Sequence, residues 1–487
     1  MKVVVTSRQT IKPSNPTPQH LCQLKLSFLD QIQQPHFVPF IYFYASSNSG
    51  LNKATNDRRR SEKLKESLSE TLLWFYPLVG RVKDNLFFDC NDEGVPFFEA
   101  QVQSSLDHVV GQSNSNSPLN CLFPYPDFDH AGDLRLAVQL NFFNCGGMAI
   151  GSFLALDLSA SKIQAKRLCT SHKIADALST VMFMKFWATI SRGDHSNLVY
   201  PQFGSANIFP PTLNPNTNHH KHGVGTTKNK IIAKSFVFSD SAISTLKAKY
   251  TPTTPTTPTT TTTTVTANNK TIHNNPTRVE ALSTFIWCRY KAATRGEAVC
   301  GEGIRYLVVQ GVNLRTRLNP SLPNSYYGNL SRFSIAILAP PALEKGAIGE
   351  DHRSLVTQMR DGIRKVNSDY VRKLQEGGGG GMGGLNSKKE EGGNKGGGGG
   401  GEAVFTFVFS SIARFPLYET DFGWGRPVWV TMGVVNLDHA ITFLPTKSGD
   451  GIEALIFMNK GDLAKLETDK EFLSFVSNPK FPLLSSL

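Results

Sequence analysis

Long apolar runs are missing from this sequence of 487 residues. No apolar run reaches the roughly 18 residues that a membrane-spanning helix needs, and the richest stretch, Thr180–Ile190, is interrupted by Lys185. Residues Met1–Pro13 alternate between apolar and polar and contain no apolar signal core. The sequence therefore predicts a protein without a membrane span or secretory signal, and we expect a cytoplasmic location.

Paired cysteines are missing too, because the seven cysteines are widely scattered and form no CxxC pair. Such spacing argues against a disulfide framework and against a structural zinc site. His219, His220 and His222 stand close together, but no carboxylate or cysteine lies near them at ligand spacing. A surface loop is the expected interpretation of these histidines, and we predict reduced, mostly buried thiols and no bound metal.

Several catalytic signatures are absent. There is no G-x-S-x-G element, so a serine hydrolase would lack its nucleophile. The run that begins with Asp421-Phe422-Gly423 has no accompanying strand lysine or His-Arg-Asp loop, which argues against a kinase. The glycine tract Gly377–Gly401 is not followed by Gly-Lys-Ser/Thr, so it is not a phosphate loop. One base acting on two bound substrates remains the economical mechanism.

The net charge of +12 does not predict a nucleic-acid partner. Basic residues are dispersed along the chain, apart from Arg58–Arg60, which are typical of a solvated helix face. A polyphosphate ligand such as CoA would benefit from the same positive field, but charge alone does not single it out.

Alternating strands and helices in both halves predict an α/β architecture with mixed sheets. Asn56 and Asp57 are candidate N-caps for a helix in which leucines recur at 64, 68 and 72. The strands are expected at Val3–Ile11, Val38–Ala45, Tyr306–Leu314, Val404–Phe409, Val428–Val435 and Ala454–Met458, and further helices at about Ala175–Ile190 and Arg353–Leu374.

The length allows two domains, each with its own core. We place an N-terminal domain at residues 1–200, a crossover loop rich in Pro, Asn and Thr at 201–229, and a C-terminal domain at 230–487. Within the last, the Thr/Pro tract and the glycine tract predict disordered inserts at 251–270 and 376–402.

Two runs, taken together, resemble the BAHD acyltransferase family over nearly the whole chain. Its HxxxD element matches His172 and Asp176, and its DFGWG element matches Asp421–Gly425 without change. Supporting matches include Phe75-Tyr76-Pro77-Leu78, Phe285-Ile286-Trp287, the strand Asn313–Arg317 and Tyr327-Gly328-Asn329. The run Ile11–Pro18 and the surroundings of His172 resemble the subgroup that contains vinorine synthase.

This resemblance implies two similar chloramphenicol-acetyltransferase-like domains, with mixed sheets flanked by helices and an active-site channel at the domain interface. It implies direct acyl transfer, with acetyl favoured, from acyl-CoA to an alcohol or amine in a ternary complex, with no permanent cofactor. His172 would be the general base, since imidazole titrates near pH 6.5 and is largely neutral in the cytosol. One chain would form the whole site, so we expect a monomer.

The resemblance also assigns supporting residues. Asp176 would point away from His172 and pair with an arginine of the strand resembling Asn313–Arg317, and we choose Arg315 over Arg317. Such a pair would fix the catalytic loop structurally.

The Asp421–Gly425 run has two interpretations. Asp421 could be a second catalytic acid, but a structural turn is favoured, because Gly423 and Gly425 permit tight backbone and Trp424 supplies packing area. Ser410 or Ser411, just upstream, could donate a hydrogen bond to CoA or to the oxyanion.

One departure from the family is an insertion of about 17 residues near Ser152–Leu168, next to His172. The inserted residues could displace the base or could loop out. An intron translated by mistake would give the same kind of insertion. The alternative to an active enzyme is therefore a catalytically impaired family member that binds a small molecule or a partner protein.

Overall fold

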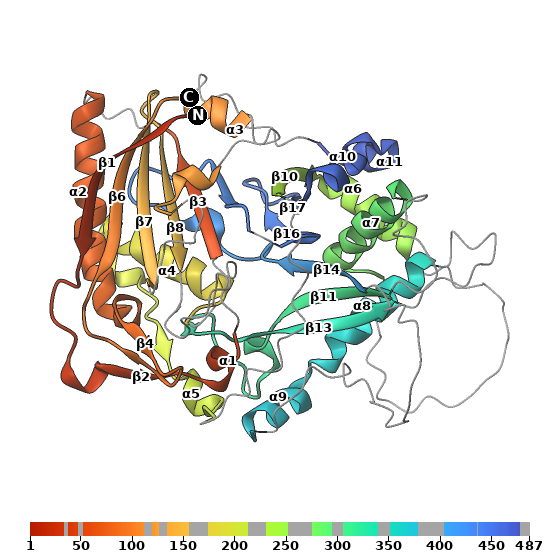
Figure 1. Cartoon of the computed structure of the whole chain (residues 1–487), viewed down its shortest axis with the longest axis horizontal. Coiled ribbons are helices and arrows are strands. Elements are labelled where there is room, and N and C mark those ends of the chain that lie inside the picture. The colour runs from red at the N-terminus through yellow and green to blue at the C-terminus, as the bar shows by residue number, and fades with distance from the viewer. Residues whose placement is uncertain are drawn as a thin grey trace, which may run out of the picture.

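The computed structural model describes residues 1–33, 38–46, 52–111, 119–125, 134–154, 174–212, 230–251, 275–294, 305–338, 351–377, 404–435 and 437–477. Within these ranges the chain forms two six-stranded sheets flanked by helices, with the N-terminal sheet at the left of Figure 1 and the C-terminal sheet at the right. His172, His219, His220, His222, most of the insertion and most of both predicted inserts lie outside the described residues. No helix within the described ranges is both long and apolar enough to span a membrane.

The N-terminal sheet has the strand order β1-β6-β7-β8-β3-β15 and is antiparallel except for the β6–β7 pair. Strands β3 and β7 are buried along their whole length, which matches their near-continuous apolar sequences. The strands of this sheet are β1 (Val3–Ile11), β3 (Val38–Tyr44), β6 (Val95–Val102), β7 (Leu136–Phe143), β8 (Met148–Leu154) and β15 (Trp429–Met432).

The C-terminal sheet has the order β10-β17-β16-β14-β11-β13, with β14 parallel to both of its neighbours. The predicted α/β architecture with mixed sheets is confirmed. The strands are β10 (Ile231–Phe238), β11 (Arg305–Asn313), β13 (Ser331–Leu338), β14 (Val404–Ser411), β16 (Ala440–Pro445) and β17 (Ile452–Asn459). Two small sheets pair β12 (Tyr326–Tyr327) with β9 (Gln202–Phe203), and β5 (Phe87–Asp89) with β2 (Gln23–Lys25) and β4 (Arg81–Lys83).

The helices that matter most for the site are α2 and α4, which pack against each other in the N-terminal half. Leu64, Leu68 and Leu72 of α2 are fully buried, as their spacing predicts. The Trp187 indole of α4 donates to the Leu64 carbonyl at 3.3 Å. The helices are α1 (Phe28–Gln31), α2 (Lys53–Trp74), α3 (Leu106–Gly111), α4 (Ala177–Arg192), α5 (Ser205–Ile208), α6 (Asp240–Tyr250), α7 (Arg278–Ala293), α8 (Asp351–Lys365), α9 (Ser368–Gln375), α10 (Lys460–Thr468) and α11 (Lys470–Phe475).

Several predicted boundaries are wrong. Helix α2 is capped by Asn52, whose side chain accepts from the Thr55 amide, while Asn56 and Asp57 lie buried inside the helix. The single helix expected at Arg353–Leu374 is two helices, because the Asn367 side chain accepts from the Tyr370 amide and starts α9 as a new helix.

Two segments expected to be irregular contain regular structure. Ser152–Leu154, the first three residues of the expected insertion, continue β8 and pair with β3. The crossover expected at 201–229 contains β9 and α5 in its described part.

One strand of the N-terminal sheet, β15, comes from the C-terminal half of the sequence. Strand β15 follows the DFGWG run in sequence, yet it pairs with β3 at the edge of the N-terminal sheet. Its Trp429 stacks on Phe43, with ring centroids 5.0 Å apart, and its indole N–H lies 3.3 Å from a carboxyl oxygen of Glu453 in the C-terminal sheet. The two sheets are therefore tied together, and the division at residues 200 and 230 stays a prediction.

Glu453 is a buried carboxyl at this junction and is only 3% exposed. Burial raises its pKa from the usual 4.5 to about 7, against hydrogen bonds from Ser235 and Trp429 that act to lower it. Between about pH 4.5 and 7 the Glu453 carboxyl therefore keeps its proton in the folded chain and loses it in the unfolded chain. As a result, this residue's contribution to stability falls as pH rises between about 4.5 and 7.

We predict that Glu453→Gln, which stays neutral, becomes more stable relative to wild type as pH rises. The difference in melting temperature, mutant minus wild type, should be larger at pH 8 than at pH 5 in thermal unfolding followed by fluorescence. Glu66→Gln, at an exposed position of α2, is the matched control and should show no such trend. An equal difference at both pH values would mean that the Glu453 carboxyl is not held neutral.

Candidate active site

Helix α4 begins directly after the segment that contains His172. Asp176 is its N-cap, because the Asp176 Oδ1 atom accepts from the Ser179 amide at 2.9 Å and the residue itself is extended. Ile174 and Ala175, the first described residues of this region, are buried in the largest core cluster. The chain is therefore fixed from Ile174 onward.

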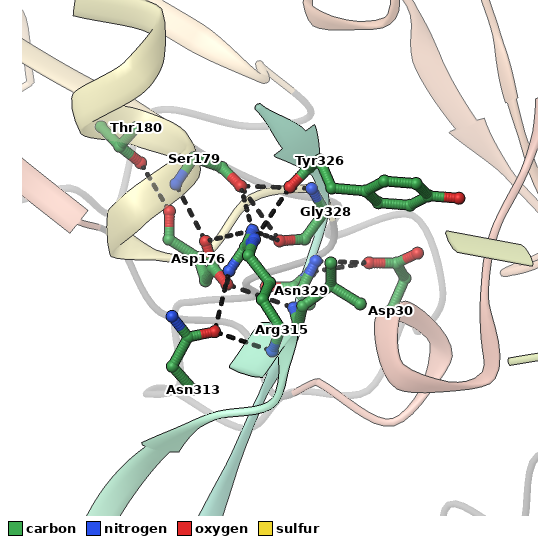
Figure 2. Close-up of polar contacts among 10 residues, drawn as sticks. Asp30, Asp176, Ser179, Thr180, Asn313, Arg315, Tyr326, Gly328 and Asn329 are labelled. Atoms are coloured by element: carbon green, nitrogen blue, oxygen red, sulfur yellow. Dashed lines mark hydrogen bonds and ion pairs between the residues drawn. The ribbon is translucent and has the colours of Figure 1, made fainter. Parts of the chain in front are cut away.

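Asp176 and Arg315 form a buried ion pair between the two halves, as Figure 2 shows. The Arg315 Nη1 atom lies 2.6 Å from Asp176 Oδ2, and Nη2 lies 3.2 Å from Oδ1. Arg315 is 1% exposed and Asp176 is 5% exposed. The pair chosen from the sequence is present, with a two-pronged geometry that only arginine offers.

Further donors and acceptors satisfy the rest of both groups. Arg315 also donates to the Ser179 hydroxyl at 3.0 Å and to the Tyr326 carbonyl at 2.9 Å. The Leu330 amide donates to Asp176 Oδ2 at 3.2 Å. Gly328 accepts from the Ser179 hydroxyl at 3.1 Å, and its φ of 140° is a backbone conformation that favours glycine. The charges are thus hydrogen-bonded throughout, the condition under which a buried pair is tolerated.

The electrostatics argue against a triad role for Asp176. Burial acts to raise the pKa of its carboxyl, but the Arg315 guanidinium and the Ser179 groups outweigh burial, so the pKa lies below the usual 3.8. Both carboxylate oxygens already accept hydrogen bonds from the arginine. The group is held ionised and is occupied by a structural contact.

A second buried carboxyl group, that of Asp30, supports the same region and was not predicted from the sequence. Asp30 Oδ1 accepts from the Asn329 side-chain amide at 2.9 Å, while Oδ2 accepts from the Ser27 hydroxyl at 2.6 Å. Burial raises the pKa of Asp30, although Ser27 and Asn329 bond to it. A local signal existed, because Ser27 and Asp30 form a capping box at the start of α1. The contact with Asn329 is 299 residues distant and had no such signal.

A cavity of about 290 Å³ lies beside the start of α4. Its lining includes Ile174, Asp30 of α1, Ser205 of α5, and Tyr327 and Gly328 of the C-terminal half, and β2 and β5 contribute further side chains. The cavity therefore lies where the two halves meet, a common location for ligand sites.

The DFGWG run forms a tight turn around Asp421. The Asp421 Oδ1 atom accepts from the Gly423 amide at 2.8 Å and from the Gly425 amide at 3.0 Å. Both glycines have positive φ, at 103° and 99°. Phe422 is fully buried and its ring meets that of Trp187 edge-on, with centroids 5.0 Å apart. Trp424 stacks on Phe422.

This turn holds the opposite end of α4 from Asp176. Arg192, the last residue of the helix, donates to the Asp421 carbonyl, and the Ser191 hydroxyl donates to the Phe422 carbonyl at 3.0 Å. Since an α-helix rises about 1.5 Å per residue, the two ends are roughly 24 Å apart. This separation favours the turn interpretation of Asp421 over that of a second catalytic acid.

Ser410 and Ser411 end strand β14. They lie at the same edge of the sheet as Asn313, because β11 and β14 are parallel and in register. Arg315 begins the turn that follows β11. Among the described residues, no group of three or more His, Cys, Asp or Glu side chains could hold a metal ion.

The chain is similar to known proteins over nearly its whole length. The family model described as Transferase family matches residues 1–473. Stemmadenine O-acetyltransferase of Catharanthus roseus is 32% identical, with 97% of each chain covered. Limonoid 1-O-acetyltransferase of Citrus sinensis is 32% identical over 98% of this chain and 99% of its own length. Vinorine synthase of Rauvolfia serpentina is 31% identical, with 97% of each chain covered.

Solved structures agree with the predicted fold. The crystal structure of vinorine synthase aligns with a TM-score of 0.72 at 30% identity, over 98% of this chain and 99% of that chain. F. graminearum TRI101 complexed with coenzyme A and deoxynivalenol aligns with a TM-score of 0.64 at 15% identity, over 93% and 99%, a likeness of fold alone. The chain therefore belongs to the transferase family that its motifs predicted, the BAHD acyltransferases, and is an acyltransferase.

Proposed function

We propose that this enzyme transfers an acyl group, acetyl by preference, from acyl-CoA to a hydroxyl group of a specialised metabolite such as an alkaloid, terpenoid or phenolic alcohol. The observation that carries the proposal is the set of relatives that are about a third identical over nearly their whole length. Their names are O-acetyltransferases of an alkaloid and of limonoids. Acyl-CoA acts as a co-substrate, and no permanent cofactor takes part.

The chemistry assigned to His172 is general base catalysis. Its neutral imidazole takes the proton of the acceptor hydroxyl as the oxygen attacks the thioester carbonyl, and a tetrahedral oxyanion forms. Collapse breaks the carbon–sulfur bond, and the proton passes from the imidazolium to the leaving thiolate of CoA. Both substrates are bound together, so no acyl-enzyme is needed. Ser410 or Ser411 would donate a hydrogen bond to CoA or to the oxyanion.

The buried ion pair supports this assignment, because Asp176, one of its two partners, lies four residues after His172. Asp176 and Arg315 act as positioning residues that fix the start of α4, and they do not touch the reacting atoms. The turn formed by Asp421, Gly423, Trp424 and Gly425 fixes the other end of the helix. Together these contacts hold the element that follows the base.

The remaining assignments stay predictions. They are a cytoplasmic location, a monomeric enzyme, and two domains at residues 1–200 and 230–487 joined by the segment 201–229.

We predict that the purified protein releases CoA thiol from acetyl-CoA when alkaloid, limonoid or phenolic alcohols are supplied. His172→Ala should lower kcat by roughly 10²–10⁴-fold, which is the usual effect of losing a general base. The measurement is thiol release together with mass spectrometry of the ester product. His195→Ala, at an exposed position after α4, is the matched control and should retain activity.

Full activity of His172→Ala would remove the assigned base. A folded wild-type protein that binds CoA but transfers no acyl group to any acceptor of the panel would instead support the impaired, ligand-binding alternative.

We predict that Asp421→Asn keeps near-normal kcat, because the Asn side-chain oxygen still accepts from the amides of Gly423 and Gly425. Asp421→Ala loses both hydrogen bonds and should lower the melting temperature and the activity together. A catalytic acid would behave differently, since Asp421→Asn would then lose activity by a hundredfold or more without any loss of stability. Kinetics and thermal unfolding of both variants separate the two roles.

A further inference from the structure

One face of the C-terminal sheet is only partly covered. Val408, Ala440 and Phe457 pair side by side across β14, β16 and β17, and all three are buried in the largest core cluster, to which the N-terminal half also contributes. The same row continues onto Val309 of β11 and Ile335 of β13, which are only partly buried. The N-terminal half therefore covers this face on the β14 side, and the cover decreases toward β13.

Exposed apolar side chains gather on the less covered part of this face. Phe333 and Ile337 of β13 are 51% and 44% exposed, and they share a face with Ile335, because alternate residues of a strand point to the same side. Val404 of β14 is exposed on the same side as Val408. By contrast, the intervening side chains of β13 are buried on the side where α8 packs. A group of exposed apolar side chains on one surface is typical of a binding site.

Gly311 leaves the backbone of β11 uncovered in the middle of this face. It pairs with Phe333, and its strand lies between β13 and β14, yet the residue is exposed. A Cβ atom added at Gly311 would meet nothing closer than the Ser410 Oγ atom, at 3.9 Å. Glycine inside a strand weakens the strand, and it often marks a place where a ligand approaches the backbone closely.

The position and the chemistry of this surface indicate what it binds. Gly311 lies next to Ser410, one of the two serines proposed to hydrogen-bond to CoA or to the oxyanion. The residues of β11 and β13 that form the surface are all uncharged, namely Leu307, Val309, Gly311, Phe333, Ile335 and Ile337. Such a surface suits an uncharged apolar skeleton, whereas the phosphate groups of CoA need positive charge.

We propose that Val309, Gly311 and Phe333 form the surface on which the acyl acceptor lies, and that this acceptor is a polycyclic alcohol whose rings cross Gly311 toward Ser410. The inference rests on the proposed function and makes Gly311 a residue that determines acceptor size. The ring of Phe333 packs against the apolar skeleton of the acceptor. A side chain at position 311 would fill the space that the acceptor rings occupy.

The experiment compares Gly311→Val with Gly362→Ala in the full-length protein. Gly362 of α8 is the matched control, because it lies against the opposite face of β13, where an added Cβ atom would be in ordinary contact with the Ile335 carbonyl oxygen at 3.5 Å. Neither variant should lower the melting temperature, since valine suits a strand and alanine suits a helix. We expect Gly311→Val to raise KM for the limonoid and alkaloid alcohols of the panel by at least about tenfold. KM for benzyl alcohol and for acetyl-CoA should stay unchanged, and Gly362→Ala should change none of these values.

A second variant and a binding measurement complete the test. Phe333→Ala removes a half-exposed ring, so it should weaken binding of the same alcohols by roughly threefold or more without lowering the melting temperature. Equilibrium dialysis of these alcohols measures binding without turnover. Binding that Gly311→Val weakens, in a protein that transfers no acyl group, would support this surface and contradict the proposed function. Unchanged binding and KM in both variants would overturn the inference, as would a wild type that binds none of these alcohols. A KM that rises for hexanoyl-CoA and not for the alcohols would overturn it too, since the surface would then hold the acyl chain.

Discussion

The arrangement of this enzyme depends on one buried ion pair, between Asp176 at the start of α4 and Arg315 after β11. Each charge comes from a different half of the chain, and each would be costly to bury alone. Ser179, Tyr326, Gly328 and Leu330 complete the hydrogen bonds of the pair, so the charges are compensated locally. The contact therefore joins the halves at the point where the chain leaves the proposed catalytic segment.

The far end of α4 is held in a complementary way. There the contacts are an apolar ring, Phe422, and backbone carbonyls that accept from Ser191 and Arg192. Strand β15 then continues from the same turn into the N-terminal sheet. A single stretch of the C-terminal half thus contacts the last residues of α4 and also supplies the edge strand of the N-terminal sheet. The HxxxD and DFGWG runs therefore hold opposite ends of the same helix, α4.

The features that could be predicted from the sequence either depend on nearby residues alone or follow from the HxxxD and DFGWG motifs taken together. Apolar patterns located α2 and six of the strands, namely β1, β3, β11, β14, β15 and β17, and the family motifs pointed to the Asp176–Arg315 pair. Other features depend on partners that local sequence does not reveal. The alternation around Trp429 predicts a strand but not the sheet it joins, and Asp30 meets Asn329 across 299 residues. Helix α2 begins one turn before the predicted caps, because the Asn52 side chain accepts from the Thr55 amide, while Asn56 and Asp57 lie buried inside the helix.

We propose that the ion pair positions the start of α4 for catalysis. The most direct test measures kcat/KM and hydrogen exchange of the Ser179 and Thr180 amides in Arg315→Lys, with Arg317→Lys as control. Lysine keeps the charge but not the two-pronged contact. If the pair has this role, we expect kcat/KM to fall by at least about tenfold and exchange in the first turn of α4 to be faster for Arg315→Lys alone. Faster exchange with undiminished kcat/KM would contradict it.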